Sequence, residues 1–303
     1  MSVNSGVHFA YIDEAGNRGM VRNLTSADDH KFGLMAALVF PDDMHEEAVR
    51  LFTPAFEKFQ SAAPAGAKLH ITDAFKPGSE DWAAVATEVR EEFIRVILDQ
   101  RPMIVYGARR FKLSRLMHED NEKMRTQARE GRRSKIKLVG GNRPSDWRIE
   151  DDLVQSLSLR LDGFAELASE ACDMKQIDLL FDETDAEVAK RYEAVIQRTR
   201  NVSHGVKRVR GWDPESGEQV EGTISTTIEN APFRIDTEYL GDIRVIGKSH
   251  PLVLAADIVA NHLHHHLSQL PPDAPLHHPD SVADWRLRDR VWGVSEDASD
   301  DLF

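Results

Sequence analysis

The sequence predicts an α/β fold, in which helices flank a mixed β-sheet. Two apolar segments near the start, residues 7–13 and 31–40, read as strands joined by a polar, turn-rich loop, which is typical of a hairpin. After this hairpin, segments with helical periodicity alternate with short apolar segments typical of strands. We therefore expect a single domain over residues 1–270.

The expected strands are short and apolar, and polar or turn-forming residues bound them. Residues 31–40 contain the longest uninterrupted apolar run, Leu34 to Phe40, which favours a central position in the sheet. Segment 176–187 begins with the apolar run "IDLLF" and then turns acidic. The expected strands are 7–13, 31–40, 102–108, 176–187, 222–229 and 242–249.

The expected helices carry recognisable start signals. Acids cluster at the start of segment 41–60, where the positive end of the helix dipole favours them. Ser79 is placed to cap the next helix, and Pro251 begins the last one, where a missing N–H costs nothing. The expected helices are 41–60, 79–100, 151–173, 186–201 and 251–270. The Pro- and Asp-rich residues 271–303 predict a partly ordered tail.

Composition excludes several classes of protein. One cysteine in 303 residues, Cys172, allows neither a disulfide framework nor a cysteine-based zinc site within one chain. The run Leu34 to Phe40 is far shorter than the roughly 20 residues that a membrane span needs, and the first residues lack a signal-peptide pattern. We therefore expect a cytoplasmic protein without a membrane partner.

Charge is distributed unevenly along the chain. The net charge is −13, which gives no global attraction to nucleic acid, yet residues 109–148 hold 13 Lys or Arg and only 5 acids. We interpret this segment as a basic helical or loop insertion, and a second basic run follows at 198–210. Such segments on an acidic body are typical of a phosphate-backbone footprint, although a solvated insertion without a specific role has the same composition. The candidate nucleic-acid-binding residues are Arg132, Arg133, Lys135, Lys137, Lys207, Arg208, Lys248 and Ser249.

Acids stand at the ends of two expected strands and inside one apolar helix. Asp13 and Glu14 end the first strand, Asp182 follows "IDLLF", and Asp257 interrupts "LVLAADIVA". Each acid alone is compatible with a surface position, but a buried carboxylate costs several kcal/mol unless it is paired or bound to a metal. If the strand ends and the helix meet, the carboxylates suit Mg²⁺ or Mn²⁺, and two such ions about 4 Å apart can activate water against a phosphodiester. Asn261 and His264, one and two turns after Asp257, are candidates for the same cleft.

Four segments in order resemble the motifs of a known family. "YIDEAG", "KLHITDAF", "LLFDE" and "KSHPLVLAADIVA" are similar to those of the bacterial and phage domain of unknown function 3800 family, of the ribonuclease H-like (integrase-type) superfamily. The resemblance covers about residues 8–266 and implies metal-binding roles for Asp13, Asp182 and Asp257, with Glu14 as a further candidate. It also implies positions near the site for His70 and Ser249.

The chain departs from that family pattern at two positions. Ala15 stands where the family usually has serine, and Lys68 stands where a glutamate often precedes the histidine. Asp73, three residues after His70, is a candidate for the missing carboxylate.

The favoured hypothesis is a divalent-metal-dependent nuclease acting on DNA or RNA with two Mg²⁺ or Mn²⁺ ions. Its candidate catalytic residues are Asp13, Glu14, His70, Asp73, Asp182 and Asp257. The alternative is a non-catalytic module that binds nucleic acid or protein in a defence or mobile-element system. A metal-dependent phosphatase ranks last, because Asp182 and Asp185 are spaced one residue too far apart for its aspartyl motif.

Overall fold

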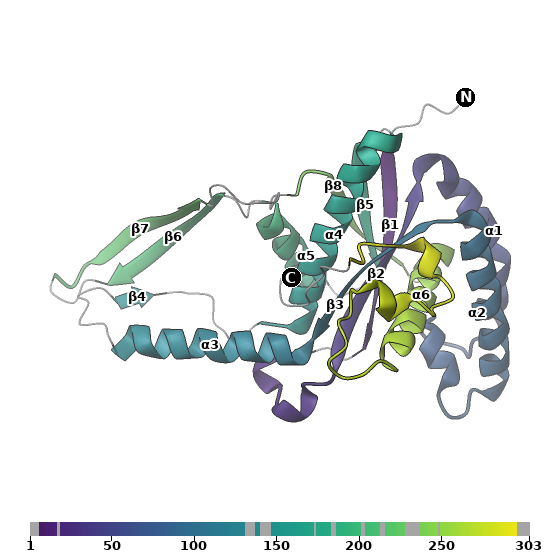
Figure 1. Cartoon of the computed structure of the whole chain (residues 1–303), viewed down its shortest axis with the longest axis horizontal. Helices are drawn as coiled ribbons and strands as arrows, with labels where there is room; N and C mark the ends of the chain where they lie inside the picture. Colours follow the sequence, from purple (N-terminus) through teal and green to yellow (C-terminus); the bar gives the residue numbers. More distant parts are fainter. Residues whose placement is uncertain are drawn as a thin grey trace.

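The computed structural model shows an α/β body from which an elongated arm projects (Figure 1). It describes residues 6–16, 19–130, 137–139, 147–172, 174–182, 186–200, 204–212, 216–227, 237–247 and 249–295. Within these residues, no helix combines the length and the apolar character that crossing a membrane requires.

A six-stranded mixed sheet forms the centre of the body, in the order β8-β5-β1-β2-β3-β9. Its strands are β1 (Val7–Gly16), β2 (Phe32–Pro41), β3 (Met103–Arg110), β5 (Gln176–Asp182), β8 (Leu240–Ile246) and β9 (Val291–Trp292). β1, β2 and β3 form an antiparallel meander, whereas β5 lies parallel to β1 and β8 lies parallel to β5. The predicted mixed sheet is confirmed, and this architecture is consistent with a ribonuclease H-like fold.

Helices cover both faces of the sheet, as the sequence predicted. α1 (Asp42–Ala62), α2 (Glu80–Gln100) and α6 (Pro251–Leu267) share one hydrophobic core with the sheet, while α4 (Ile149–Cys172) and α5 (Ala186–Thr199) share the other. Strand side chains alternate between the faces, so β1 sends Tyr11 towards α6 and Ile12 towards α4. β2 is buried from Phe32 to Phe40 because apolar layers cover both of its faces.

The arm unites the two basic segments of the sequence. It consists of α3 (Phe111–Glu130) and a three-stranded antiparallel sheet of β4 (Lys137–Val139), β6 (His204–Trp212) and β7 (Gln219–Thr227). Figure 1 shows α3 and this small sheet extending from the same side of the body. β4 comes from the basic insertion and β6 contains residues 204–210 of the second basic run, so their pairing joins segments far apart in the chain. The sequence reading did not predict β6, because its alternating pattern is obscured by glycines and basic residues.

Ion pairs and hydrogen bonds hold the base of the arm on the body. The Asp152 carboxylate of α4 accepts hydrogen bonds from Ser114 Oγ at 2.7 Å and from Trp147 Nε1 at 2.8 Å. Arg115 of α3 donates to both carboxylate oxygens of Asp29, at 2.8 and 2.7 Å. A two-point contact of this kind fixes direction as well as distance, so it orients the first turns of α3.

Residues 271–295, at the start of the expected tail, pack against the body. Leu276, Val282, Trp285 and Leu287 are buried, and β9 adds a short parallel strand next to β3. Residues 296–303 lie outside the described part of the chain. Short 3-10 helices complete the fold at Val21–Asn23, Ser26–Asp28, Ile71–Phe75, Pro279–Val282 and Arg288–Arg290.

Candidate metal centre

Asp13 reaches the interior because of its place in the alternation of β1. Tyr11 and Ala15, two residues on either side, belong to the core under α6, so Asp13 faces α6 as well and is only 2% exposed. Glu14 follows Ile12 in the alternation and is therefore directed to the opposite face of the sheet. The adjacent acids that suggested a joint site are thus placed on different faces.

Asp182 lies beside Asp13 at the same edge of the sheet. β1 and β5 are parallel, and their register pairs Ile12 with Phe181, so the next residues along the two strands are Asp13 and Asp182. Leu180 packs in the α6 core, so Asp182 faces the same side, and it is buried. Parallel pairing therefore brings together two carboxylates separated by 169 positions in the sequence.

α6 supplies Asp257 from above the sheet. The helix runs along β1 in the same direction, since its N-cap His250 stacks on Tyr11 with ring centroids 5.1 Å apart and His264 lies against Gly16. Asp257, between these two contacts, is 3% exposed. Its Oδ2 accepts a hydrogen bond from the Ile71 backbone N–H at 2.6 Å, and its Oδ1 accepts one from Asn261 Nδ2 at 2.6 Å. These two donors hold the carboxylate in one orientation.

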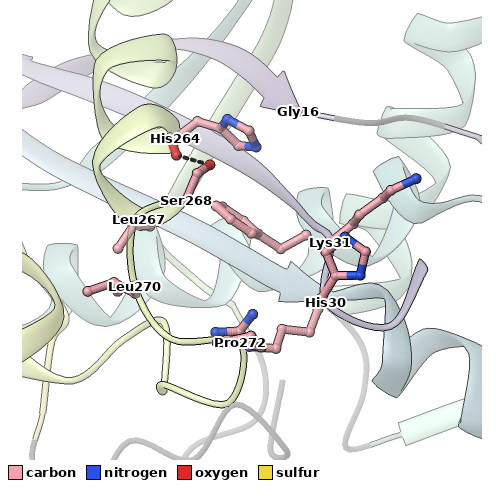
Figure 2. Close-up of a pocket in the computed structure, with 10 residues that line it drawn as sticks. Gly16, His30, Lys31, His264, Leu267, Ser268, Leu270 and Pro272 are labelled. Atoms are coloured by element: carbon pink, nitrogen blue, oxygen red, sulfur yellow. Dashed lines mark hydrogen bonds between the residues drawn. The ribbon is translucent and has the colours of Figure 1, made fainter. Parts of the chain in front are cut away.

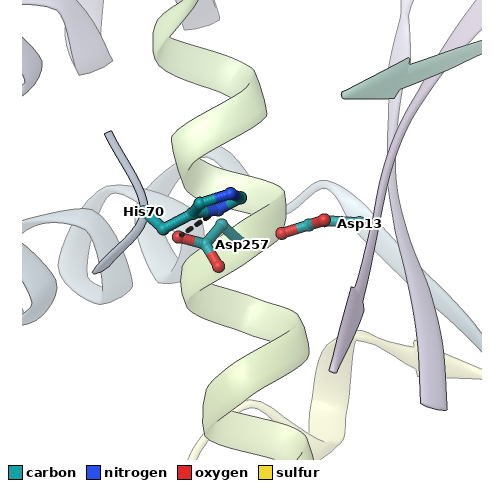
Figure 3. A group of neighbouring side chains, drawn as sticks. All are labelled: Asp13, His70 and Asp257. Atoms are coloured by element: carbon teal, nitrogen blue, oxygen red, sulfur yellow. Dashed lines mark ion pairs between the residues drawn. The ribbon is translucent and has the colours of Figure 1, made fainter. Parts of the chain in front are cut away.

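His70 completes the cluster from the loop before the 3-10 helix Ile71–Phe75. Its Nδ1 lies 3.9 Å from Asp257 Oδ2, and its Nε2 lies 4.0 Å from Asp182 Oδ2. Figure 3 shows Asp13 pointing from its strand towards Asp257 on the helix, with His70 beside Asp257. Asp13, His70 and Asp257 each offer one ligand atom, and these atoms lie within 4.8 Å of one another. A single divalent cation could contact all three.

Burial and mutual repulsion make it unfavourable for Asp13 and Asp257 to be ionised at the same time. Burial raises the pKa of Asp13 well above its usual value, and the charges of Asp257, Glu14 and Asp182 raise it further. Burial also raises the pKa of Asp257, although the hydrogen bond from Ile71 and the nearby His70 oppose that shift. The two carboxyl groups hydrogen-bond each other. In the described part of the chain, no lysine or arginine forms an ion pair with either group, so a bound cation is the natural means of stabilising both as carboxylates.

The remaining candidates in the described part of the chain lie outside the three-residue ligand group. Asp73 pairs with Lys76 at 2.5 Å and is not part of the three-residue ligand group. Ser249 is exposed, one residue before the N-cap of α6. Lys137 lies in β4, and Lys207 and Arg208 lie in β6. Arg132, Arg133, Lys135 and Lys248 fall outside the described residues.

Two further contributors to the site differ in how visible they are from sequence. Asn261 is one turn after Asp257, and the predicted proximity is confirmed by its hydrogen bonds to the Asp257 side chain and backbone. The Ile71 N–H is a main-chain donor, and its role depends on where the loop lies rather than on which side chain it carries. Sequence reasoning missed it, and no residue-type signal could have revealed it.

Comparisons of the chain with protein-family models, with curated proteins and with solved structures found no match. The resemblance noted in the sequence therefore stays a prediction.

Proposed function

We propose that the protein is a divalent-metal-dependent nuclease that hydrolyses phosphodiester bonds of DNA or RNA. The observation that carries this proposal is the meeting of Asp13, Asp182, Asp257 and His70 at one edge of the sheet. Three carboxylates and an imidazole form an oxygen-rich ligand set, which suits Mg²⁺ or Mn²⁺ better than softer metals. When bound there, such an ion would lower the pKa of a water molecule and stabilise charge on the phosphate.

The side chains around the ion would have distinct tasks. Asp13 and Asp257 are the buried ligands, and the hydrogen bonds from Asn261 and the Ile71 N–H keep the Asp257 carboxylate oriented. His70 Nε2 faces Asp182 and His70 Nδ1 faces Asp257, so Asp182 could contact a second ion or the water. His70 is more exposed than the carboxylates, with 23% of its side chain accessible, so it can exchange a proton with solvent or with the leaving oxygen.

The arm supports nucleic acid as the substrate class. Its α3, β4 and β6 come from the two basic segments, and it extends from the body as an elongated unit (Figure 1). A basic projection beside an acidic, metal-dependent centre could hold the phosphate backbone while the body cleaves it. This arrangement separates binding from chemistry in space.

The test is cleavage by the purified full chain with Mg²⁺ or Mn²⁺. We expect labelled single-stranded or double-stranded DNA or RNA to be cut, with activity abolished by EDTA. Asp13→Asn and Asp257→Asn should each lower the cleavage rate by about a hundredfold or more, because each removes a ligand charge. Asp178→Asn is the matched control, since Asp178 is equally buried in β5 but forms an ion pair with Arg244 at 3.0 Å.

Two results would contradict the proposal. Cleavage that survives both Asp13→Asn and Asp257→Asn would show that the cluster does not catalyse it. A protein that binds nucleic acid but shows neither Mn²⁺ binding by calorimetry nor cleavage would instead be the non-catalytic binding module.

A further inference from the structure

A small pocket opens beyond the carboxylate cluster, where strands β1 and β3 end and β2 begins. Figure 2 shows it between the C-terminal turns of α6 and the start of β2. Its volume is about 250 Å³, and its polar lining includes His30, Lys31, Arg110, His264 and Ser268. Pockets for drug-sized ligands occupy about 300–1,000 Å³, so this pocket suits a smaller group.

The same two elements, β1 and α6, contribute residues to the pocket and to the proposed metal centre. Along β1, Gly16 comes three residues after Asp13, and along α6, His264 comes seven residues after Asp257. Three strand residues and seven helical residues each correspond to about 10 Å of rise. Because β1 and α6 run side by side, the pocket is therefore about 10 Å from the cluster, roughly three nucleotides of axial rise along one strand.

Gly16 allows α6 to approach the sheet at this point. Its φ is +93°, and a Cβ on it would lie 2.6 Å from His264 Nε2 and 2.8 Å from the Phe32 carbonyl oxygen. Burial lowers the pKa of His264, and its ring hydrogen-bonds the Phe32 backbone. His264 thus forms a neutral wall of the pocket, with its ring 4.6 Å from that of Phe32.

The charge of the pocket is opposite to that of the chain. None of its ten lining residues is acidic, although the chain carries a net charge of −13. The Arg110 guanidinium donates to the carbonyl oxygens of Ala274 at 2.5 Å and Pro271 at 3.4 Å, and these contacts orient it at the pocket. Lys31 is held at the rim by Asp28 at 2.8 Å, and 41% of its side chain stays accessible. Lys31 is ion-paired with Asp28, but its ammonium, the Arg110 guanidinium and the His30 imidazole all carry N–H groups that can donate to the oxygens of a phosphate.

We propose that this pocket binds a phosphate group of the nucleic-acid substrate, a few nucleotides from the bond that is cleaved. The inference rests on the proposed nuclease function and adds to it a subsite that sets the position of the strand. Its volume of about 250 Å³ is large enough for a phosphate with part of its sugar. The phosphate is either a strand end or an internal phosphodiester, and both present the same anionic oxygens.

Binding without cleavage tests this subsite. In EDTA, fluorescence anisotropy would measure the affinity of the full chain for internally labelled DNA and RNA strands. Each strand would carry a 5′-phosphate, a 3′-phosphate or no terminal phosphate. We expect Lys31→Ala, and more strongly His30→Ala/Lys31→Ala, to weaken binding by about tenfold or more. Lys58→Ala is the matched control, because Lys58 is similarly exposed and paired with Glu88 but belongs to α1, outside the pocket. Circular dichroism would verify that each variant is folded.

The pattern of loss identifies the phosphate. A loss confined to one phosphorylated end assigns the pocket to a terminal phosphate, whereas an equal loss for all strands assigns it to an internal phosphodiester. If the double variant binds every strand as the wild type does, while the wild type cleaves DNA or RNA with Mn²⁺, the subsite is refuted and the nuclease proposal stands. A wild type that neither binds nor cleaves any strand refutes both.

Discussion

Replacing Asp13 by asparagine should stabilise the metal-free protein at neutral pH. The pKa of Asp13 is raised well above its usual value, chiefly by burial and then by the charges of Asp257, Glu14 and Asp182. A carboxyl group with a raised pKa binds its proton more tightly in the folded state than in the unfolded state. Its contribution to stability is therefore present at low pH and is lost as pH rises from the unfolded pKa, about 3.9, to the raised folded pKa.

The size of the effect follows from proton linkage. Through that window the folded state holds one proton that the unfolded state has released, so the free energy of unfolding falls by about 1.4 kcal/mol per pH unit. Asparagine has nearly the same shape, carries no charge and can donate a hydrogen bond to Asp257. The variant should therefore lack this decrease, and its advantage over the wild type should grow with pH across the window.

Urea denaturation after EDTA treatment, followed by circular dichroism from about pH 4 to about pH 8, measures the difference between the two proteins. Adding Mn²⁺ should reduce the advantage of the variant. A ligand at a hundredfold excess over its Kd stabilises the folded state by about 2.7 kcal/mol, and only the wild type should gain this. Asp178→Asn is the control with the opposite sign. Its carboxylate accepts hydrogen bonds from Arg244, Gln176 and the Asp242 N–H, so the metal-free variant should lose stability and keep its response to Mn²⁺.

Two results would refute this reasoning. One is a difference in the free energy of unfolding between the wild type and Asp13→Asn that stays the same at every pH. The other is equal stabilisation of both proteins by Mn²⁺, which would place the ion away from Asp13.

Two further predictions concern the surroundings of the site. Gly16→Ala should lower the free energy of unfolding by about 1–2 kcal/mol because of the positive φ, and by about another 1–3 kcal/mol because the new Cβ would be crowded. Gly66→Ala is the control, since Gly66 has a φ of +77° but nothing lies within 4 Å of a Cβ there, so it should show only the first loss. Equal losses in urea denaturation would contradict the close approach of α6. Arg115→Ala removes the two-point contact with Asp29, so amide hydrogen exchange should accelerate in the first turns of α3. Lys123→Ala breaks an exposed ion pair with Asp120 on the same helix and should leave hydrogen exchange in the first turns of α3 unchanged. Similar exchange rates in the two variants would show that the Arg115–Asp29 contact does not anchor the arm.

The local pattern of the chain was sufficient to predict most of the body. Apolar runs located β1, β2, β3 and β5, and helical periodicity located α1, α2, α4, α5 and α6, because burial in this fold follows directly from repeating side-chain positions. The same patterns could not reveal β6, or the packing of residues 276–287, whose apolar side chains follow no regular period. Their positions depend on partners that are distant in sequence, namely β4 for β6 and β3 for residues 276–287.

For the site, the sequence by itself determined which carboxylates are costly to bury, since Asp13, Asp182 and Asp257 each adjoin apolar runs. Only the tertiary structure decided which of them meet. Strand alternation directs Asp13 towards α6 and Glu14 to the opposite face, and the parallel register of β1 and β5 brings Asp182 beside Asp13. The Ile71 N–H and the basic pocket around Lys31 also come from packing between distant segments. Residue types state what a group can bind, but the distances and the direction of its neighbours are properties of the folded chain alone.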